Sequence, residues 1–276
     1  MAVTDLLVVI IAVILHRIRG IYFPVSFLTT TPGCSASAAL NYAARDSSVW
    51  LTVTFTFDRC VAICCQKLKT KYCTEKTAAV VIATVCSLSC IKHIPTYFIY
   101  EPVYIIDNVP WFCSIKLSFY TSPGWAAFDW LDRILTPCVP FVLILLLNML
   151  TIRHVLMANK ARKRFQHHCN GSNQSDSEME NRKKSIILLL SISGSFVALW
   201  MAYVINMFYV RLTKGSYFEG SNNTDQRFIL QESGYMLQLF SCCTNTCIYA
   251  VTQSKFRKEL NNAVKYPFKL FFKFWK

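Results

Sequence analysis

Six long apolar windows constrain the fold of this chain more than any other feature. Each can cross the roughly 30 Å hydrocarbon core of a bilayer, which takes about 20 helical residues. Lipid offers no hydrogen-bonding partners, so each window must be a helix that satisfies its own backbone. The sequence therefore predicts an all-α membrane protein with six spans. The windows are 1–18, 35–65, 77–99, 128–157, 184–210 and 230–252.

The composition also favours a lipid environment. The chain is 54% hydrophobic and only 16% charged, whereas soluble domains carry roughly 25% charged residues. Its formal net charge of +14 could indicate nucleic acid, but the Lys and Arg residues cluster between the apolar windows instead of forming one solvated face. We therefore expect a lipid bilayer as a partner and no nucleic acid.

The charge of the connecting segments predicts the orientation. If the six spans alternate, the basic segments 66–76, 153–184 and 255–276 fall on one side. Cytoplasmic loops carry an excess of Lys and Arg, so this side is expected to be the cytoplasm and both termini to lie there. We predict a bundle over residues 1–252 with a cytoplasmic polar loop at 158–183.

Residues 253–276 follow the last window and are rich in basic and aromatic side chains. This composition predicts a short amphipathic helix and a basic-aromatic tail on the inner membrane surface. The first window carries Asp5 inside its apolar stretch and has no basic start. We therefore interpret it as a membrane helix and not as a removed signal peptide.

The outer face is predicted to carry two modifications. Of the 13 cysteines, only Cys34 and Cys113 fall clearly on the oxidising side. Two such cysteines are each other's obvious partners, and the alternative is two unpaired thiols. The sequence Asn222-Asn223-Thr224 predicts glycosylation of Asn222 on the same face.

Ionisable residues inside the windows indicate function, because burying a charge in lipid is costly. Asp5 needs polar partners, and Ser48, Ser241 and Asn245 lie at plausible depths in other spans. Such a cluster could hold a cation or water, and the alternative is a single acid that reaches the interface. Asp58 and Arg59 stand together at the cytoplasmic end of the second window.

Enzymatic chemistry has no support in the sequence. His154, His167 and His168 are too few and too close to the predicted cytoplasmic side to form a zinc site. We expect no enzyme activity, no metal apart from a cation at Asp5, and no cofactor.

Taken together, six short motifs give the chain a resemblance to class A (rhodopsin-like) G protein–coupled receptors over nearly its whole length. They occur in the family's order at compatible spacings. The motifs are Ala2-Val3-Thr4-Asp5 of the second helix, the pair Cys34 and Cys113, Asp58-Arg59-Cys60, Pro140, Leu199-Trp200-Met201-Ala202, and Asn245-Thr246-Cys247-Ile248-Tyr249.

The resemblance implies a seven-helix receptor bundle that lacks its first helix and ends in a short eighth helix. It implies that Arg59 contacts a heterotrimeric G protein and pairs with Asp58 in the inactive state. The implied activation switch is Trp200, Asn245, Tyr249 and Pro140. The implied sodium site is Asp5, Ser48, Ser241 and Asn245. The implied ligand pocket is Asn41, Tyr42, Arg45, Trp200 and Tyr203.

Within the family, the chain looks most like an orphan, peptide-receptor-like branch associated with sensing aromatic amino acids. The branch's acidic and basic pocket residues are replaced by Asn41 and Tyr203, so its ligand is not carried over. Three motif positions also differ from the family, with Cys60 in place of Tyr and with Ala202 and Thr246 in place of Pro. Because Met1 lies only four residues before Asp5, we expect a truncated product or an incomplete gene model.

The leading expectation is a plasma-membrane receptor that binds an extracellular small molecule or peptide and activates a G protein. One alternative is a truncated, non-signalling partner that retains full-length receptors in the endoplasmic reticulum. A six-helix carrier ranks last, because the sequence has no internal repeat and no pore motif.

Overall fold

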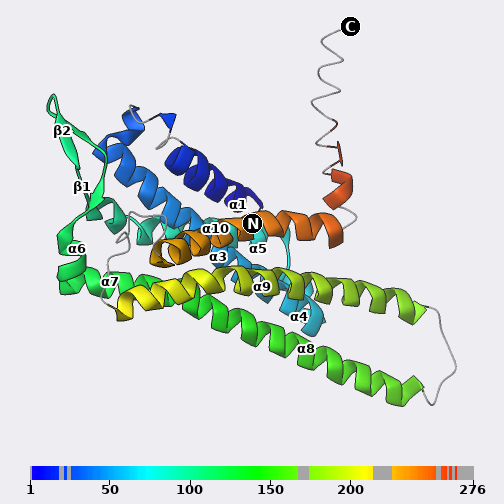
Figure 1. The fold of residues 1–276 in the computed structure, drawn as a ribbon. Coiled ribbons are helices and arrows are strands. Elements are labelled where there is room, and N and C mark those ends of the chain that lie inside the picture. The colour runs from blue at the N-terminus through cyan, green and yellow to red at the C-terminus, as the bar shows by residue number, and fades with distance from the viewer. Residues whose placement is uncertain are drawn as a thin grey trace, which may run out of the picture.

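The computed structural model describes residues 2–18, 22–23, 26–166, 174–213, 226–252, 256–259, 261–262 and 265. Long helices form a bundle, and a small β-hairpin projects from one end (Figure 1). The predicted helical membrane fold is confirmed. The long helices are α1 (Ala2–Val9, continued by a π-helical segment, Ile10–Ile18), α3 (Thr31–Cys64), α5 (Glu75–Lys92), α8 (Val139–Gln166), α9 (Gln174–Leu212) and α10 (Gln226–Thr252).

Short elements connect the long helices. The short helices are α4 (Gln66–Tyr72), α6 (Leu117–Thr121) and α7 (Pro123–Arg133), with a π-helical turn at Ile134–Cys138 and 3-10 turns at Phe27–Thr29 and Pro95–Ile99. The strands are β1 (Tyr100–Glu101), β2 (Tyr104–Ile106), β3 (Val109–Trp111) and β4 (Ser114–Ile115).

Three helical segments of the described chain are long and apolar enough to cross a membrane, namely Glu75–Ile99, Pro123–Ala158 and Ser185–Val210. A shorter apolar helix covers Thr4–Leu15. Helix α3 is long enough but less apolar, because it buries a row of polar side chains such as Asn41, Arg45 and Asp46 inside the bundle. The number of six membrane crossings stays a prediction.

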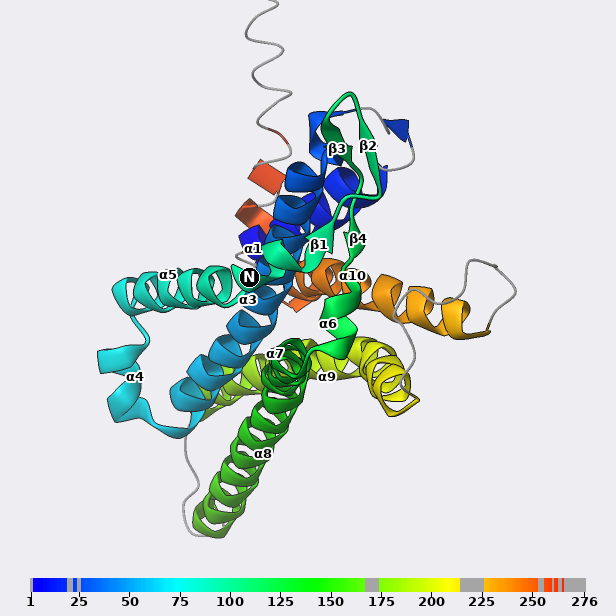
Figure 2. The ribbon, with the colours of Figure 1, turned by 90° about the vertical axis from the view of Figure 1, so that its left-hand side faces the viewer.

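Helix α3 occupies the centre of the bundle. It contacts α1, α5, α8 and α9, while α10 packs along both α9 and α1 (Figure 2). One buried cluster joins α3, α8 and α9 through Val49, Val53, Ile144, Phe196 and Trp200. A second cluster joins the first helix to α10 through Val8, Ala12, Leu239 and Cys242. The central helix therefore links the two halves of the core.

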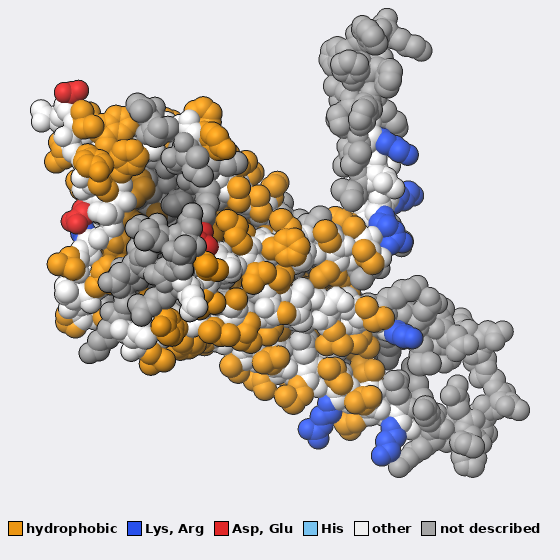
Figure 3. All heavy atoms as spheres, in the orientation of Figure 1, with side chains coloured by type: hydrophobic (Ala, Val, Ile, Leu, Met, Phe, Trp, Pro, Cys, Tyr) orange, Lys and Arg blue, Asp and Glu red, His pale blue; other side chains and the backbone are white. Residues whose placement is uncertain are grey.

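On the face drawn in Figure 3, hydrophobic side chains spread over the side of the bundle, and most of the visible Lys and Arg lie at the end away from the hairpin. Large apolar residues such as Leu150, Leu156 and Ile205 are more than half exposed. Soluble monomers rarely expose contiguous apolar patches of this extent. The surface therefore suits contact with lipid.

The connection from α5 to α6 contains an antiparallel hairpin that the sequence analysis did not predict. Strands β2 and β3 pair from Tyr104 opposite Trp111 to Ile106 opposite Val109. The two residues between them, Asp107 and Asn108, have φ values of 51° and 61°. A two-residue hairpin turn favours positive φ at both positions, where Asn and Asp are well tolerated.

The helix that contains Pro140 is interrupted four residues before this proline. Thr136 has non-helical φ and ψ angles of −146° and 105°. Pro140 has no N–H to donate to the carbonyl of Thr136, so the helical hydrogen bond at this position cannot form. Thr136 also directly precedes Pro137, and a residue before proline is pushed out of the helical region toward extended φ and ψ angles.

The predicted loop at 158–183 is shorter than expected. Helix α8 continues to Gln166 and α9 begins at Gln174, so only 167–173 lie outside the described residues. The segment after Ala158 is rich in Lys, Arg and Ala, which have high helix propensity, so the helix continues beyond its apolar part. Residues 256–259 and 261–262 of the expected eighth helix are helical, and the tail 266–276 lies outside the described chain.

Candidate functional site

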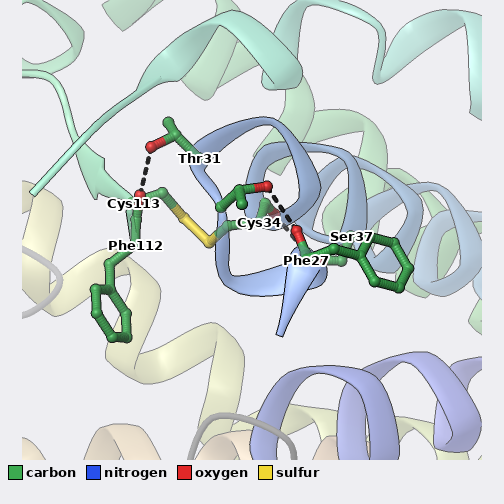
Figure 4. The surroundings of a disulfide bond; sticks show 7 residues. Phe27, Thr31, Cys34, Ser37, Phe112 and Cys113 are labelled. Atoms are coloured by element: carbon green, nitrogen blue, oxygen red, sulfur yellow. Dashed lines mark hydrogen bonds between the residues drawn. A yellow bond between two sulfur atoms is a disulfide. The ribbon is translucent and has the colours of Figure 1, made fainter. Parts of the chain in front are cut away.

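A disulfide joins the start of α3 to the segment that follows the hairpin. Cys34 and Cys113 are bonded (Figure 4), which confirms the predicted pair. Next to it, Thr31 Oγ1 donates to the carbonyl of Phe112 at 2.7 Å (Figure 4). The amide of Phe112 in turn donates to the carbonyl of Thr29 at 2.7 Å. These contacts hold the base of the hairpin against one end of the bundle.

A cavity of about 220 Å³ opens at the hairpin end of the bundle. Four of the five predicted pocket residues, Asn41, Tyr42, Arg45 and Tyr203, line it. Much of the remaining wall is aromatic and includes Tyr100 of β1. Burial raises the pKa of the Tyr100 phenol above its ordinary value. The cavity thus combines aromatic and aliphatic side chains with many polar and charged groups, among them Arg45, Asp129 and Glu232.

Trp200 lies below this cavity. It lines a neighbouring cavity of about 20 Å³ and not the larger one. Its ring packs against Tyr203, with centroids 5.8 Å apart, and against Phe196 at 5.3 Å. Its Nε1 donates to Ser241 Oγ at 3.0 Å. Trp200 therefore contacts Tyr203, which lines the larger cavity, and is bonded to Ser241 of α10.

The predicted polar cluster around Asp5 forms, with one change in membership. Asp5 Oδ1 accepts a hydrogen bond from Ser48 at 2.6 Å, and Oδ2 accepts one from Asn245 Nδ2 at 3.1 Å. All three residues are buried. Ser241 Oγ, in contrast, donates to the carbonyl of Gln238 and accepts from Trp200. The structure thus brings three of the four residues into direct contact, and the fourth bonds to the tryptophan.

Asp58 and Arg59 form an ion pair at the opposite end of α3 from the disulfide. Arg59 donates to Asp58 Oδ2 from Nη2 at 2.6 Å and from Nε at 3.0 Å. Both side chains are 35% exposed, so Arg59 remains accessible from outside the bundle. Its guanidinium also lies 5.5 Å from the ring centroid of Phe55.

An ionic cluster that the sequence analysis missed lies beside the cavity. Lys92 Nζ is 3.1 Å from Asp46 Oδ2 and 2.8 Å from Asp132 Oδ1. His93 Nε2 lies 3.7 Å from a carboxylate oxygen of each acid, and Thr136 donates to Asp46. The signal was present in the sequence, because these charges stand inside the second, third and fourth apolar windows.

Two of the predicted functional residues lie wholly or partly outside the described part of the chain. Asn222 lies outside the described part of the chain, and so does the side chain of Tyr249. Pro140 is fully buried at the start of α8.

Comparison with known proteins identifies the family. Residues 1–249 match the family described as 7 transmembrane receptor (rhodopsin family). The chain is also similar to the B2 bradykinin receptor of Rattus norvegicus, with 25% identity over 142 residues. That alignment covers 51% of this chain and 32% of the relative, so the chain spans about a third of that receptor. Because the family match covers most of the sequence, the chain belongs to the rhodopsin family of seven-transmembrane receptors, and it is a receptor and not an enzyme.

Proposed function

We propose that this receptor binds a small molecule or peptide in the cavity beside Arg45 and activates a heterotrimeric G protein from the plasma membrane. The family match supports a receptor of this class. The name of the similar rat receptor, which refers to bradykinin, supports ligands of this kind. The cavity lies at the hairpin end, which is the extracellular side if the basic end faces the cytoplasm.

The observation that carries the proposal is the position of Trp200 between two layers. Above it, Tyr203 forms part of the cavity wall and contacts the tryptophan ring. Below it, Ser241 accepts its indole N–H. A ligand that displaces Tyr203 would therefore shift Trp200 and disturb the hydrogen bond to α10. Such a contact couples ligand binding to the relative position of α9 and α10.

The other end of the bundle supports the coupling role. The Asp58–Arg59 pair is partly exposed there, so it can open without leaving a deeply buried charge. We assign G protein contact to Arg59 once α9 moves away from α3. The interruption of the helix before Pro140 permits movement of α8. Asn245 and Tyr249 lie on α10, which would move with Trp200 because Ser241 of α10 accepts the hydrogen bond of the indole.

The cluster of Asp5, Ser48 and Asn245 is proposed as a sodium site. A carboxylate, a hydroxyl and an amide offer the oxygen ligands that hard cations prefer, so these residues fit the ion. A bound cation would offset the buried charge of Asp5. Ser241 Oγ contacts Trp200 and the carbonyl of Gln238 instead of Asp5, so its side chain would have to turn toward Asp5 to join the site.

The test is the rate of nucleotide exchange on purified G protein heterotrimers of each coupling class, with the full chain in lipid nanodiscs. We expect exchange above the receptor-free rate with at least one class. Arg59→Ala should abolish it, because the variant removes the proposed contact. Arg153→Ala is the matched control, since Arg153 is an exposed arginine at the same basic end of the bundle. Exchange that never exceeds the receptor-free rate, or that survives in Arg59→Ala, contradicts the proposal.

A further inference from the structure

Arg45 is a buried cation in the wall of the larger cavity. The residue is only 9% exposed. Its Nη1 donates to Gln238 Oε1 at 3.2 Å, and its guanidinium lies 4.6 Å from the ring centroid of Tyr42 and 5.9 Å from that of Tyr235. Its Nε has no acceptor within the described part of the chain. The guanidinium is therefore only partly satisfied.

Among the described residues, no carboxylate forms a salt bridge with Arg45, whereas the neighbouring cations are committed. Lys92 is shared between two aspartates. Arg133 donates to Asp129 at 2.9 Å. A buried guanidinium without a counter-ion is costly in a low-dielectric interior, and contact with aromatic rings compensates only in part. Among the described residues that line the cavity, Arg45 is thus a cation without a salt bridge.

A second unsatisfied group lies one helical turn away. Asn41 is 7% exposed, lines the same cavity, and its Oδ1 has no hydrogen-bond donor among the described residues. Residues four apart on a helix lie on one face, and Asn41 and Arg45 are about 6 Å apart along the axis. One small molecule can therefore meet both groups.

We propose that the ligand of this receptor carries a carboxylate, which binds the guanidinium of Arg45, and a hydrogen-bond donor, which binds Asn41. This inference rests on the proposed ligand-binding function and names its chemical class. A carboxylate matches the planar donor fork of arginine. The aromatic wall of the cavity takes the apolar body of the ligand.

The remaining charges of the cavity favour a single negative charge. Asp129, Asp132 and Glu232 also line the wall, and each has contacts of its own. A doubly charged group such as a phosphate monoester would add a second negative charge close to these acids, whereas Arg45 is the one cation without a salt bridge among the described residues that line the cavity. A monoanionic carboxylate offsets the charge of Arg45 and adds no second negative charge near these acids.

The experiment compares a matched pair of probes, para-fluorophenylacetate and the neutral para-fluorophenylacetamide. Their binding to the full chain in lipid nanodiscs is measured by fluorine NMR line broadening. In the unmodified chain, we expect the carboxylate to bind about 10- to 100-fold more tightly than the amide, as for hydrogen bonds to charged groups. In Arg45→Gln, the two probes should bind equally, because the amide never used the charge.

Three further variants make the result specific. Arg45→Lys keeps the charge without the fork and should retain part of the preference. Asn41→Asp places a negative charge beside Arg45 and the bound carboxylate, so it should reduce or abolish the preference for the carboxylate over the amide. Arg133→Gln tests whether another cation holds the carboxylate, and we expect the preference to persist. A cooperative thermal unfolding transition of each variant shows that it is folded. If Arg45→Gln does not fold, the carboxylate preference of Asn41→Asp tests whether the carboxylate binds beside Arg45.

Equal binding of the two probes to the unmodified chain, absence of binding of either probe, or an unchanged preference in Arg45→Gln would overturn the inference. The binding measurement involves no G protein. Nucleotide exchange without carboxylate preference therefore contradicts only the ligand class, whereas carboxylate preference without nucleotide exchange contradicts only the proposed signalling.

Discussion

Asp5 accepts one hydrogen bond on each carboxylate oxygen, from Ser48 and from Asn245. The three residues come from the first described helix, from α3 and from α10, so a single side chain ties three helices together. Trp200 makes a similar link between α9 and α10 through Ser241. At the scale of residues, buried polar groups thus join the helices at defined points, because an unsatisfied polar group in the bundle is costly.

The sodium proposal predicts a salt-specific stabilisation. The melting temperature of the purified chain should be higher in sodium chloride than in choline chloride at equal ionic strength, because only sodium fits among the oxygen ligands. Asp5→Asn should remove this difference, since it removes the charge and keeps the shape. Asp107→Asn, in the hairpin turn, is the control and should retain it. An equal response of the unmodified chain to both salts would refute the site.

The Trp200–Ser241 bond predicts a measurable energetic coupling. Ser241→Ala should destabilise the chain by about 1–3 kcal/mol, because it leaves the buried indole N–H without an acceptor. In the Trp200→Phe background, the same substitution should cost less, since the donor is gone. Thermal unfolding of the unmodified chain, the two single variants and the double variant gives the coupling energy of a double-mutant cycle. Ser195→Ala, which removes a hydroxyl that donates to the local carbonyl of Ile192, is the control and should show no coupling to Trp200.

At the scale of elements, the hairpin of β2 and β3 is held by its turn and by its base. Asp107 and Asn108 adopt positive φ in the turn. At the base, the disulfide Cys34–Cys113 and the bond from Thr31 to Phe112 attach the strands to α3. The hairpin therefore has a defined position over the end of the bundle that carries the cavity.

The turn predicts opposite results for two substitutions of Asn108. Asn108→Val should destabilise the hairpin by about 1–3 kcal/mol, because a β-branched residue is strained at positive φ. Asn108→Gly should leave it intact, because glycine adopts this conformation freely. Hydrogen exchange of the amides in residues 104–111 measures the effect. Equal protection in both variants would show that the turn does not control the hairpin.

At the scale of the whole molecule, an apolar lateral surface separates two different ends. The hairpin and the cavity lie at one end, and exposed Lys and Arg lie at the other (Figure 3). The positive-inside rule assigns the basic end to the cytoplasm. The resemblance to the branch associated with sensing aromatic amino acids remains a prediction.

This orientation predicts which cysteine a membrane-impermeant maleimide labels. Cys65 is exposed at the end of α3 near the basic segment, so it should react only after cells are permeabilised. A cysteine introduced as Glu101→Cys, in exposed β1, should react in intact cells. The comparison with Cys65→Ala isolates the signal of Cys65. Labelling of Cys65 in intact cells would reverse the orientation.

Much of the fold and part of the site could be predicted from local properties of the sequence. Long apolar windows must be helical in lipid. The disulfide was predicted because Cys34 and Cys113 were the two cysteines that fell clearly on the oxidising side. The hairpin was missed although Asp107-Asn108 is a turn signal, because the surrounding strands are only two or three residues long. The predicted loop at 158–183 extends into residues that are helical in the structure. Its polar residues were interpreted as irregular structure, although many of them favour a helix.

The sequence by itself indicated that this protein crosses a membrane as helices, and it marked Asp5, Asp58 and Arg59 as charges that need an explanation. Only the tertiary structure decided their partners. It bonded Ser241 to Trp200 instead of Asp5, placed Trp200 in a smaller neighbouring cavity, and left Arg45 Nε without an acceptor among the described residues. The physical reason is that helix formation depends on neighbours in the chain, whereas hydrogen bonds and ion pairs between helices depend on the rotation and depth of each helix in the bundle.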